Sequence, residues 1–218
     1  MTDLKIRRYE EDDDEVVKEI FTMGMMEQVP ASFMHMLKQP LMQMLCVCLF
    51  CTLMATSKSF LLPVLAVMLL IAGARRMVSY LFNCYLDENM KRDMAKIRET
   101  YLTTPNSCFW VGEIDGRVVA TVACLPAEKQ PECLQLKRMS VRRSHRGQGI
   151  AKALCHTVAE FTRSRGYQGV ILHTSVFATD AQYLYERVGY QKMRQFLNPL
   201  FARILNFSLI EYRLNVQP

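Results

Sequence analysis

An apolar block from Leu41 to Ala74 constrains the fold of this chain more than any other feature, because it contains a single charged residue, Lys58. A helix pair in a soluble domain normally keeps a polar stripe along its solvent-facing side. Here nearly all the polar residues gather in the middle of the block, from Thr56 to Ser59. This pattern favours two apolar helical arms joined by a polar tip, that is, a hairpin that dips into a membrane.

Arm length and flanking charge refine this expectation. Each arm is about 15 residues long, whereas a helix that crosses the hydrocarbon core needs roughly 20 residues. Lys38 precedes the block, and Arg75 and Arg76 follow it directly. Because cationic flanks favour the cytosolic side, we expect both ends of the hairpin there. One long tilted span and a buried helix pair in a soluble protein are the alternatives.

The segments on either side of the block carry the patterns of an α/β domain around a mixed sheet. Strand-like alternation opens the chain at 4–9, and a helical pattern follows it. After the block, helices are predicted at 87–104, 149–165 and 180–188, and strands at 107–125 (a hairpin), 134–141, 169–175, 191–197 and 206–214. We therefore divide the chain into 1–40, the first strand and helix plus an interfacial segment; 41–74, the hairpin; and 75–218, the remainder of the domain.

Length, charge and cysteine content exclude several classes of protein. A chain of 218 residues fits one domain with an insertion. The net charge of +6 favours an anionic ligand or membrane surface but is too diffuse to indicate nucleic acid. The eight cysteines form no C-x-x-C pair with histidines at ligand spacing, so we expect no metal. The acidic, polar N-terminal sequence does not resemble a signal peptide.

A glycine-rich cationic turn, RRSHRGQG from Arg142 to Gly149, lies between a predicted strand and a predicted helix. The first turn of a helix leaves backbone N–H groups without partners, and these groups carry the positive end of the helix dipole. Glycines permit the tight turn and let a phosphate approach the backbone closely. Arginines add charge and forked donors. The turn is therefore predicted to cradle a diphosphate. A structural turn with surface cations is the alternative.

The residue patterns of two motifs resemble those of one protein family. R-x-x-G-x-A at residues 146–151 resembles the acetyl-CoA motif of the Gcn5-related N-acetyltransferases (GNAT), and A-x-x-L-Y-E-x-x-G-Y at 181–190 resembles that family's downstream helix. The predicted order of elements also resembles the GNAT fold. The apolar insertion narrows the resemblance to the membrane-bound camello-type branch, which includes the cysteine-S-conjugate N-acetyltransferase.

The resemblance implies an acyltransferase that uses acetyl-CoA as cosubstrate, sits in the endoplasmic reticulum membrane with a cytosolic catalytic domain, and acts on a small amphipathic amine such as a cysteine S-conjugate. Its implied partners are that small-molecule acceptor and membrane lipid, without nucleic acid. Two other functions remain open: acetylation of protein lysines or N-termini, and a catalytically silent CoA-binding membrane scaffold. The oligomeric state is not specified by the sequence.

The resemblance also implies roles for particular residues. Backbone groups from residues 146 to 151 would bind the pyrophosphate, with side-chain cations nearby, and strand residues would pair with the pantetheine arm. The cofactor-binding candidates are Met139, Val141, Arg142, Arg143, His145, Arg146, Gly147, Gln148, Gly149, Ile150 and Ala151. Tyr185 is the candidate general acid, or else a core tyrosine. Glu132 is the candidate general base; Glu113, His173 and ordered water are the other choices.

Overall fold

The computed structural model describes residues 4–57, 59–197 and 208–216. Its centre is a seven-stranded mixed sheet with strand order β1-β2-β3-β4-β5-β7-β6. Among the strands in the described part of the chain, only β4 and β5 pair in parallel; the other neighbouring strands are antiparallel. The strands are β1 (Lys5–Arg8), β2 (Cys108–Ile114), β3 (Arg117–Pro126), β4 (Cys133–Val141), β5 (Gly169–Ser175), β6 (Gln191–Leu197) and β7 (Ser208–Asn215). The predicted α/β fold with a mixed sheet is confirmed.

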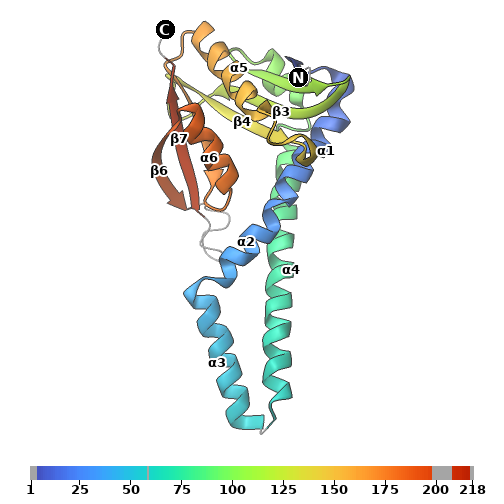
Figure 1. Cartoon of the computed structure of the whole chain (residues 1–218), viewed down its shortest axis with the longest axis vertical. Helices are drawn as coiled ribbons and strands as arrows, with labels where there is room; N and C mark the ends of the chain where they lie inside the picture. The colour runs from blue at the N-terminus through green and yellow to red at the C-terminus, as the bar shows by residue number, and fades with distance from the viewer. Residues whose placement is uncertain (1–3, 58, 198–207, 217–218) are drawn as a thin grey trace.

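Helices cover both faces of the sheet (Figure 1). On one face, α5 (Ile150–Ser164) buries Ile150, Leu154 and Val158 against the largest hydrophobic cluster, and α6 (Thr179–Val188) lies beside it. On the other face, α1 (Asp14–Met26) contacts β3 and β4. The helical spacing of apolar residues in the sequence thus matches the faces that α1 and α5 bury.

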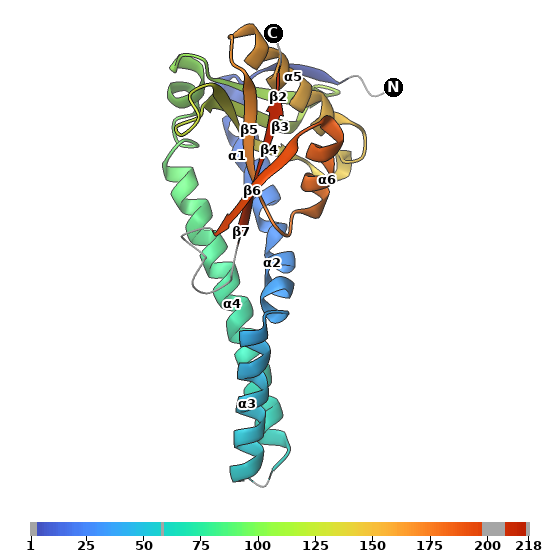
Figure 2. The ribbon, with the colours of Figure 1, turned by 90° about the vertical axis from the view of Figure 1, so that its left-hand side faces the viewer.

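A long helical hairpin projects from this domain (Figures 1 and 2). It consists of α3 (Pro40–Ser57) and the first half of α4 (Leu61–Lys91). Both helices are long and apolar enough to cross a membrane, and only 6% of the apolar stretch of α3 and 17% of that of α4 is buried in the protein. Core helices of a soluble domain would be mostly buried. These helices therefore present their apolar side chains to the outside.

The second half of α4 belongs to the α/β domain. The helix runs through Ala74 without a break, and from there Ala74, Val78 and Phe82 pack against Met36 of α2 (Gln28–Leu37). Helix α2 thus forms most of the segment before the hairpin that was predicted to lie along the membrane interface, and in the structure it packs against α4. Strand β1 pairs with β2, from Lys5↔Glu113 to Arg8↔Trp110. Both ends of the apolar insertion therefore return to one sheet.

The helix predicted at 87–104 differs from the structure. Here α4 ends at Lys91, and a π-helical turn, η2 (Arg98–Thr103), follows after a short irregular segment. Within this segment the Asp93 carboxylate accepts hydrogen bonds from Tyr101 and Arg138, and Met94 and Ile97 are buried. These buried and hydrogen-bonded side chains fix the segment against the domain, and the predicted helix is interrupted there. The predicted strand at 206–214 corresponds to β7, although Asn206 and Phe207 lie outside the described residues.

Candidate functional site

The turn between β4 and α5 is built on two glycines in left-handed conformations. Gly147 has φ 78° and Gly149, the N-cap of α5, has φ 82°. Side chains rarely adopt these conformations, which explains why the sequence has glycine at both positions. A Cβ added at either glycine would meet nothing within 4 Å. The outer surface of this backbone is therefore open to a ligand.

The N-terminus of α5 adds positive character to this surface. Gly149 offers no side-chain capping hydrogen bond, and no acidic residue lies in the first turn. The amides of a first helical turn have no partner within the helix and carry the positive end of its dipole. This end of α5 therefore has the electrostatic character that an anion site needs.

Two arginines of the turn are fixed by carboxylates of the N-terminal helices. Arg142 donates two hydrogen bonds to Glu19 of α1, at 2.7 and 3.1 Å. Arg146 donates to the Val141 carbonyl at 3.0 Å and forms an ion pair with Glu27 at 2.6 Å. The hydrogen bonds and charge of Arg142 lower the pKa of Glu19. These arginines therefore connect the turn to α1, a role that the sequence did not indicate.

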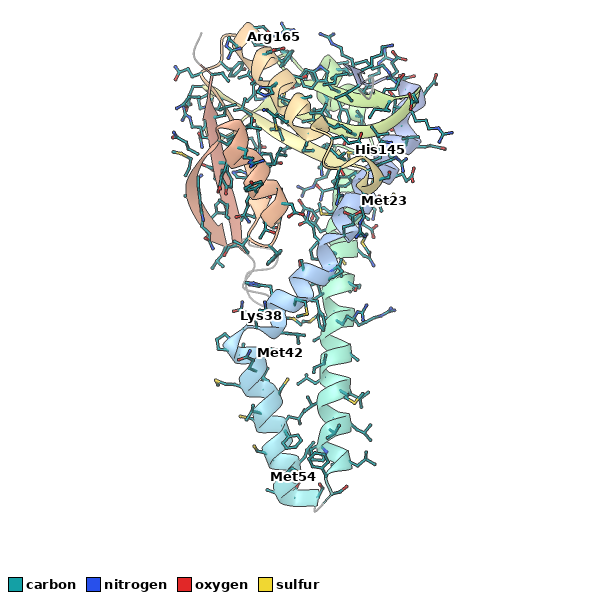
Figure 3. All side chains as sticks on the ribbon, viewed as in Figure 1. Met23, Lys38, Met42, Met54, His145 and Arg165 are labelled. Atoms are coloured by element: carbon teal, nitrogen blue, oxygen red, sulfur yellow. The ribbon has the colours of Figure 1, made fainter. Side chains whose placement is uncertain are left out.

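The remaining cations of the turn face outward. Arg143 is exposed, and its side chain makes no hydrogen bond or ion pair with any residue that the structure describes. His145 shares a 2.8 Å hydrogen bond with the Ser144 hydroxyl. In Figure 3, His145 and Met23 lie at the edge of the domain that faces the hairpin, whereas Arg165 lies at the far end. The open turn is thus on the hairpin side of the domain.

An open strand edge continues the site. Strands β4 and β5 pair only from Cys133↔Gly169 to Gln135↔Ile171, although β4 runs on to Val141. The Arg138 carbonyl accepts from Thr121, and the Arg142 amide donates to Val119, so both groups face β3. Since peptide groups alternate along a strand, the backbone groups of Met139 and Val141 face the unpaired side. An extended ligand could add to this edge as a strand does.

Tyr185 lies in the hydrophobic core on the α5 side of the sheet. Its side chain is 6% exposed, and its ring lies 5.6 Å from Tyr190 and 6.1 Å from Tyr212. Burial raises the pKa of Tyr185, so the phenol is protonated at neutral pH. The hydroxyl of the neighbouring Tyr190 is buried and forms no hydrogen bond with another described residue. These features fit a proton donor and a packed tyrosine equally, and both interpretations stand.

The carboxylate candidates for a general base lie away from the turn. Glu132 immediately precedes β4, at the strand end opposite the turn, and accepts from Arg213 at 3.3 Å. Glu113 accepts from Arg7 at 2.8 Å, where β1 pairs with β2. The structure therefore does not bring either glutamate together with the open turn.

His173, the other side chain considered as a base, belongs to a polar cluster where β4 leaves β5. Its Nε2 lies 3.0 Å from Glu211 Oε2, and its Nδ1 lies 3.1 Å from Gln135 Nε2. Arg194 donates to the same Glu211 oxygen at 2.9 Å, and Gln130 donates to the other oxygen at 3.1 Å. Burial would raise the pKa of Glu211, but these donors outweigh it and lower that pKa. The cluster therefore holds an ionised carboxylate behind the imidazole.

Comparisons with known proteins agree with this geometry. Residues 74–190 match the acetyltransferase (GNAT) family. N-acetyltransferase 8F1 of Mus musculus is 36% identical over 216 residues, covering 98% of this chain and 97% of that protein. The probable N-acetyltransferase camello of Xenopus tropicalis is 33% identical over 218 residues, covering 100% of both. A solved GNAT-family acetyltransferase from Staphylococcus aureus Mu50 has the same fold, with a TM-score of 0.61, 17% identity, and coverage of 98% and 99%.

The chain therefore belongs to the GNAT family and is an acetyl-transfer enzyme. Within that family, its relatives are the N-acetyltransferase 8 and camello-type proteins, which match it along nearly its whole length. The resemblance inferred from the two sequence motifs and the apolar insertion is confirmed.

Proposed function

We propose that this chain is a membrane-anchored N-acetyltransferase that moves an acetyl group from acetyl-CoA to the amine of a small amphipathic amino acid, with a cysteine S-conjugate as the preferred acceptor. One observation carries the proposal: the open glycine turn and the open edge of β4 lie on the same side of the domain as an exposed apolar hairpin (Figure 3). The protein thus combines an anion cradle with a surface for lipid.

The residues of the turn fit acetyl-CoA. Backbone amides from Arg146 to Ala151 bind the pyrophosphate, and the outward-facing Arg143 and His145 add positive charge beside it. Met139 and Val141 hydrogen-bond the pantetheine arm through the unpaired edge of β4. Acetyl-CoA supplies the acetyl group as a thioester, and the chain orients that group at the gap between β4 and β5.

Proton transfer needs an acid and a base. Tyr185 is the proposed acid, because it occupies the tyrosine position of the family's downstream helix motif and its phenol holds a proton at neutral pH; burial raises its pKa, so the proton leaves only once charge develops on the sulfur. Among the candidate bases, His173 is better supported than Glu132. It stands where the two strands diverge and is oriented by the Glu211 carboxylate, whereas Glu132 is paired with Arg213. A carboxylate behind an imidazole stabilises the imidazolium that forms on proton uptake.

The hairpin provides the membrane anchor. Leu41 is 65% exposed and Leu69 is 73% exposed, so both side chains lack protein partners over most of their surface. Exposed apolar area of this extent favours lipid over water. Lys38, Arg75 and Arg76 bound the apolar region on the domain side and favour a cytosolic catalytic domain, in line with an endoplasmic reticulum membrane. An anchor beside the site suits acceptors whose apolar tails partition into the interface.

Purified full-length protein in detergent, supplied with acetyl-CoA and a panel of amines, tests the proposal. We expect turnover of S-benzyl-cysteine and little turnover of aspartate, a lysine peptide or a free peptide N-terminus. Preferred acetylation of the peptides would replace the small-acceptor function with protein acetylation. Gly149→Glu is expected to abolish acetyl-CoA binding, because it places a bulky anion in the cradle.

Gly116→Glu is the matched control for Gly149→Glu. Gly116 has φ 73°, and a Cβ added there would also meet nothing within 4 Å, but this glycine lies in the β2–β3 turn. The strain of placing a side chain at positive φ is therefore similar in the two variants. Loss of binding in both variants would indicate misfolding rather than a blocked cradle, and retained binding in Gly149→Glu would refute the assigned site.

A further inference from the structure

Lys137 lies beside the proposed reaction site, on the sheet face opposite α5. It stands in β4 two residues after Gln135, which contacts His173, and two residues before Met139. Its Cα pairs with Ala123, which belongs to the cluster packed under α1. The side chain is half-buried, and its ammonium group forms no hydrogen bond or ion pair with any residue in the described part of the chain.

Neighbouring cations on this face are neutralised, in contrast to Lys137. Arg138, the next residue, donates to the Asp93 carboxylate at 2.5 and 2.9 Å and to Asn89 at 2.7 Å. Arg194 donates to Glu211, which also accepts from His173 and Gln130. The carboxylates of Asp93 and Glu211 each have several donors, and among the described residues neither forms a hydrogen bond or ion pair with Lys137.

An unpaired ammonium at a half-buried position is unfavourable for folding, because burial removes part of its hydration. Burial lowers the pKa of Lys137; the charges of Asp93 and Glu128 oppose this effect, and the charge of Arg138 adds to it. A methionine or leucine would fit a half-buried strand position without this cost. Residues that lower the stability of the fold in this way are found preferentially at functional sites.

We propose that Lys137 binds the carboxylate of the acceptor, so that the enzyme selects α-amino acids over simple amines. This inference rests on the proposed function, since it assigns the acceptor end of that same site. A carboxylate held at Lys137 places the α-amine of the same molecule toward His173 and the open edge of β4. The charge-assisted hydrogen bond recognises one end of the acceptor and leaves the side chain of the acceptor free to vary.

Two acceptors that differ only in the carboxylate test the inference: S-benzyl-cysteine and S-benzyl-cysteamine. In the full-length protein, Lys137→Met is expected to raise the KM for S-benzyl-cysteine by about 10- to 100-fold, the range for losing a hydrogen bond to a charged group. The kcat/KM for S-benzyl-cysteamine and the KM for acetyl-CoA are expected to stay within about twofold, since neither interaction involves Lys137. Lys137→Arg should restore most of the discrimination.

Lys129→Met, at an exposed lysine in the β3–β4 loop, is the control for removing a positive charge. Equal losses with both acceptors in Lys137→Met, or no loss with either, would overturn the role of Lys137 and leave the proposed function intact. If the wild-type protein acetylates neither amine but does acetylate peptides, the proposed function fails first and the inference fails with it. Wild-type discrimination that disappears only in Lys137→Met would support both.

Discussion

The hairpin and the α/β domain contain the same apolar residue types in opposite settings. In the domain, Phe109 and Leu154 are fully buried, whereas in the hairpin Leu41 and Leu69 are 65% and 73% exposed. The helix α4 passes from one setting to the other, with Leu69 outside and Val78 inside the protein. Apolar composition therefore identifies surfaces that avoid water. It does not say whether such a surface packs against protein or against lipid.

The largest expected effect is in the domain core. Phe109→Ala should reduce the free energy of unfolding by about 3–5 kcal/mol, because it removes a ring packed edge-on against Tyr9 and Tyr101. Leu69→Ala should leave that free energy unchanged. Denaturant unfolding followed by the fluorescence of Trp110, the single tryptophan, measures both. A similar loss of unfolding free energy in the two variants would mean that the hairpin, like the domain core, is packed against protein.

Asp93→Asn tests the domain segment that directly follows α4. It leaves Arg138, whose side chain is 10% exposed, without its carboxylate and should cost about 3 kcal/mol. Burial would raise the pKa of Asp93, but the hydrogen bonds and charge of Arg138 outweigh it, so this pKa is lowered. The stabilisation is therefore present above the unfolded pKa of about 4 and is lost as pH falls through the lower folded value.

Unfolding measured from pH 5 to pH 2 provides the check for Asp93. The wild-type protein should lose stability more steeply than Asp93→Asn across this range, since the variant has no carboxylate to protonate there. Parallel pH profiles would show that the pair with Arg138 contributes little to folding.

In the hairpin, a charge should affect membrane binding and spare the fold. Leu69→Arg is expected to weaken partitioning into liposomes by about 2.5 kcal/mol, the cost of a cation within the apolar layer. Acetylation in detergent should be unchanged. Flotation of the full-length protein with liposomes measures the first quantity. Undiminished flotation would mean that this surface does not enter lipid, and its apolar residues would need another partner.

The smallest expected effect concerns the boundary between the two regions. Arg76→Gln should weaken binding to liposomes that contain anionic lipid by about 1 kcal/mol and leave binding to neutral liposomes unchanged. Arg165→Gln, at an exposed position at the end of the domain far from the hairpin (Figure 3), is the control. A loss with neutral liposomes would contradict an electrostatic role for this residue.

Local sequence signals predicted the parts of the structure that depend on near neighbours. Gly147 and Gly149 marked a turn that needs positive φ, and Thr56 and Ser59 marked the end of one apolar arm and the start of the next. Paired motifs at 146–151 and 181–190 supplied the family. Within each turn or motif the deciding residues lie within about ten positions of one another, so no tertiary information was needed.

The missed contacts all join distant segments. Arg142 was predicted to lie near the phosphates; the structure adds a contact with Glu19 across 123 positions, because α1 packs over the end of β4. His173 gains Glu211 only through the antiparallel register of β5 and β7. A charged residue is assigned correctly only when its partner is known, and a single sequence does not identify that partner.

The continuity of α4 has a mechanical consequence. A helix of 31 residues is about 46 Å long, so a rigid tilt of 10° displaces one end by about 8 Å relative to the other. The outer end of α4 lies in the proposed lipid layer, and near its inner end Asn89 holds Arg138, the residue next to Lys137. In the proposed membrane-bound enzyme, a change in bilayer thickness or lateral pressure would therefore reach the proposed acceptor end of the site along this one helix.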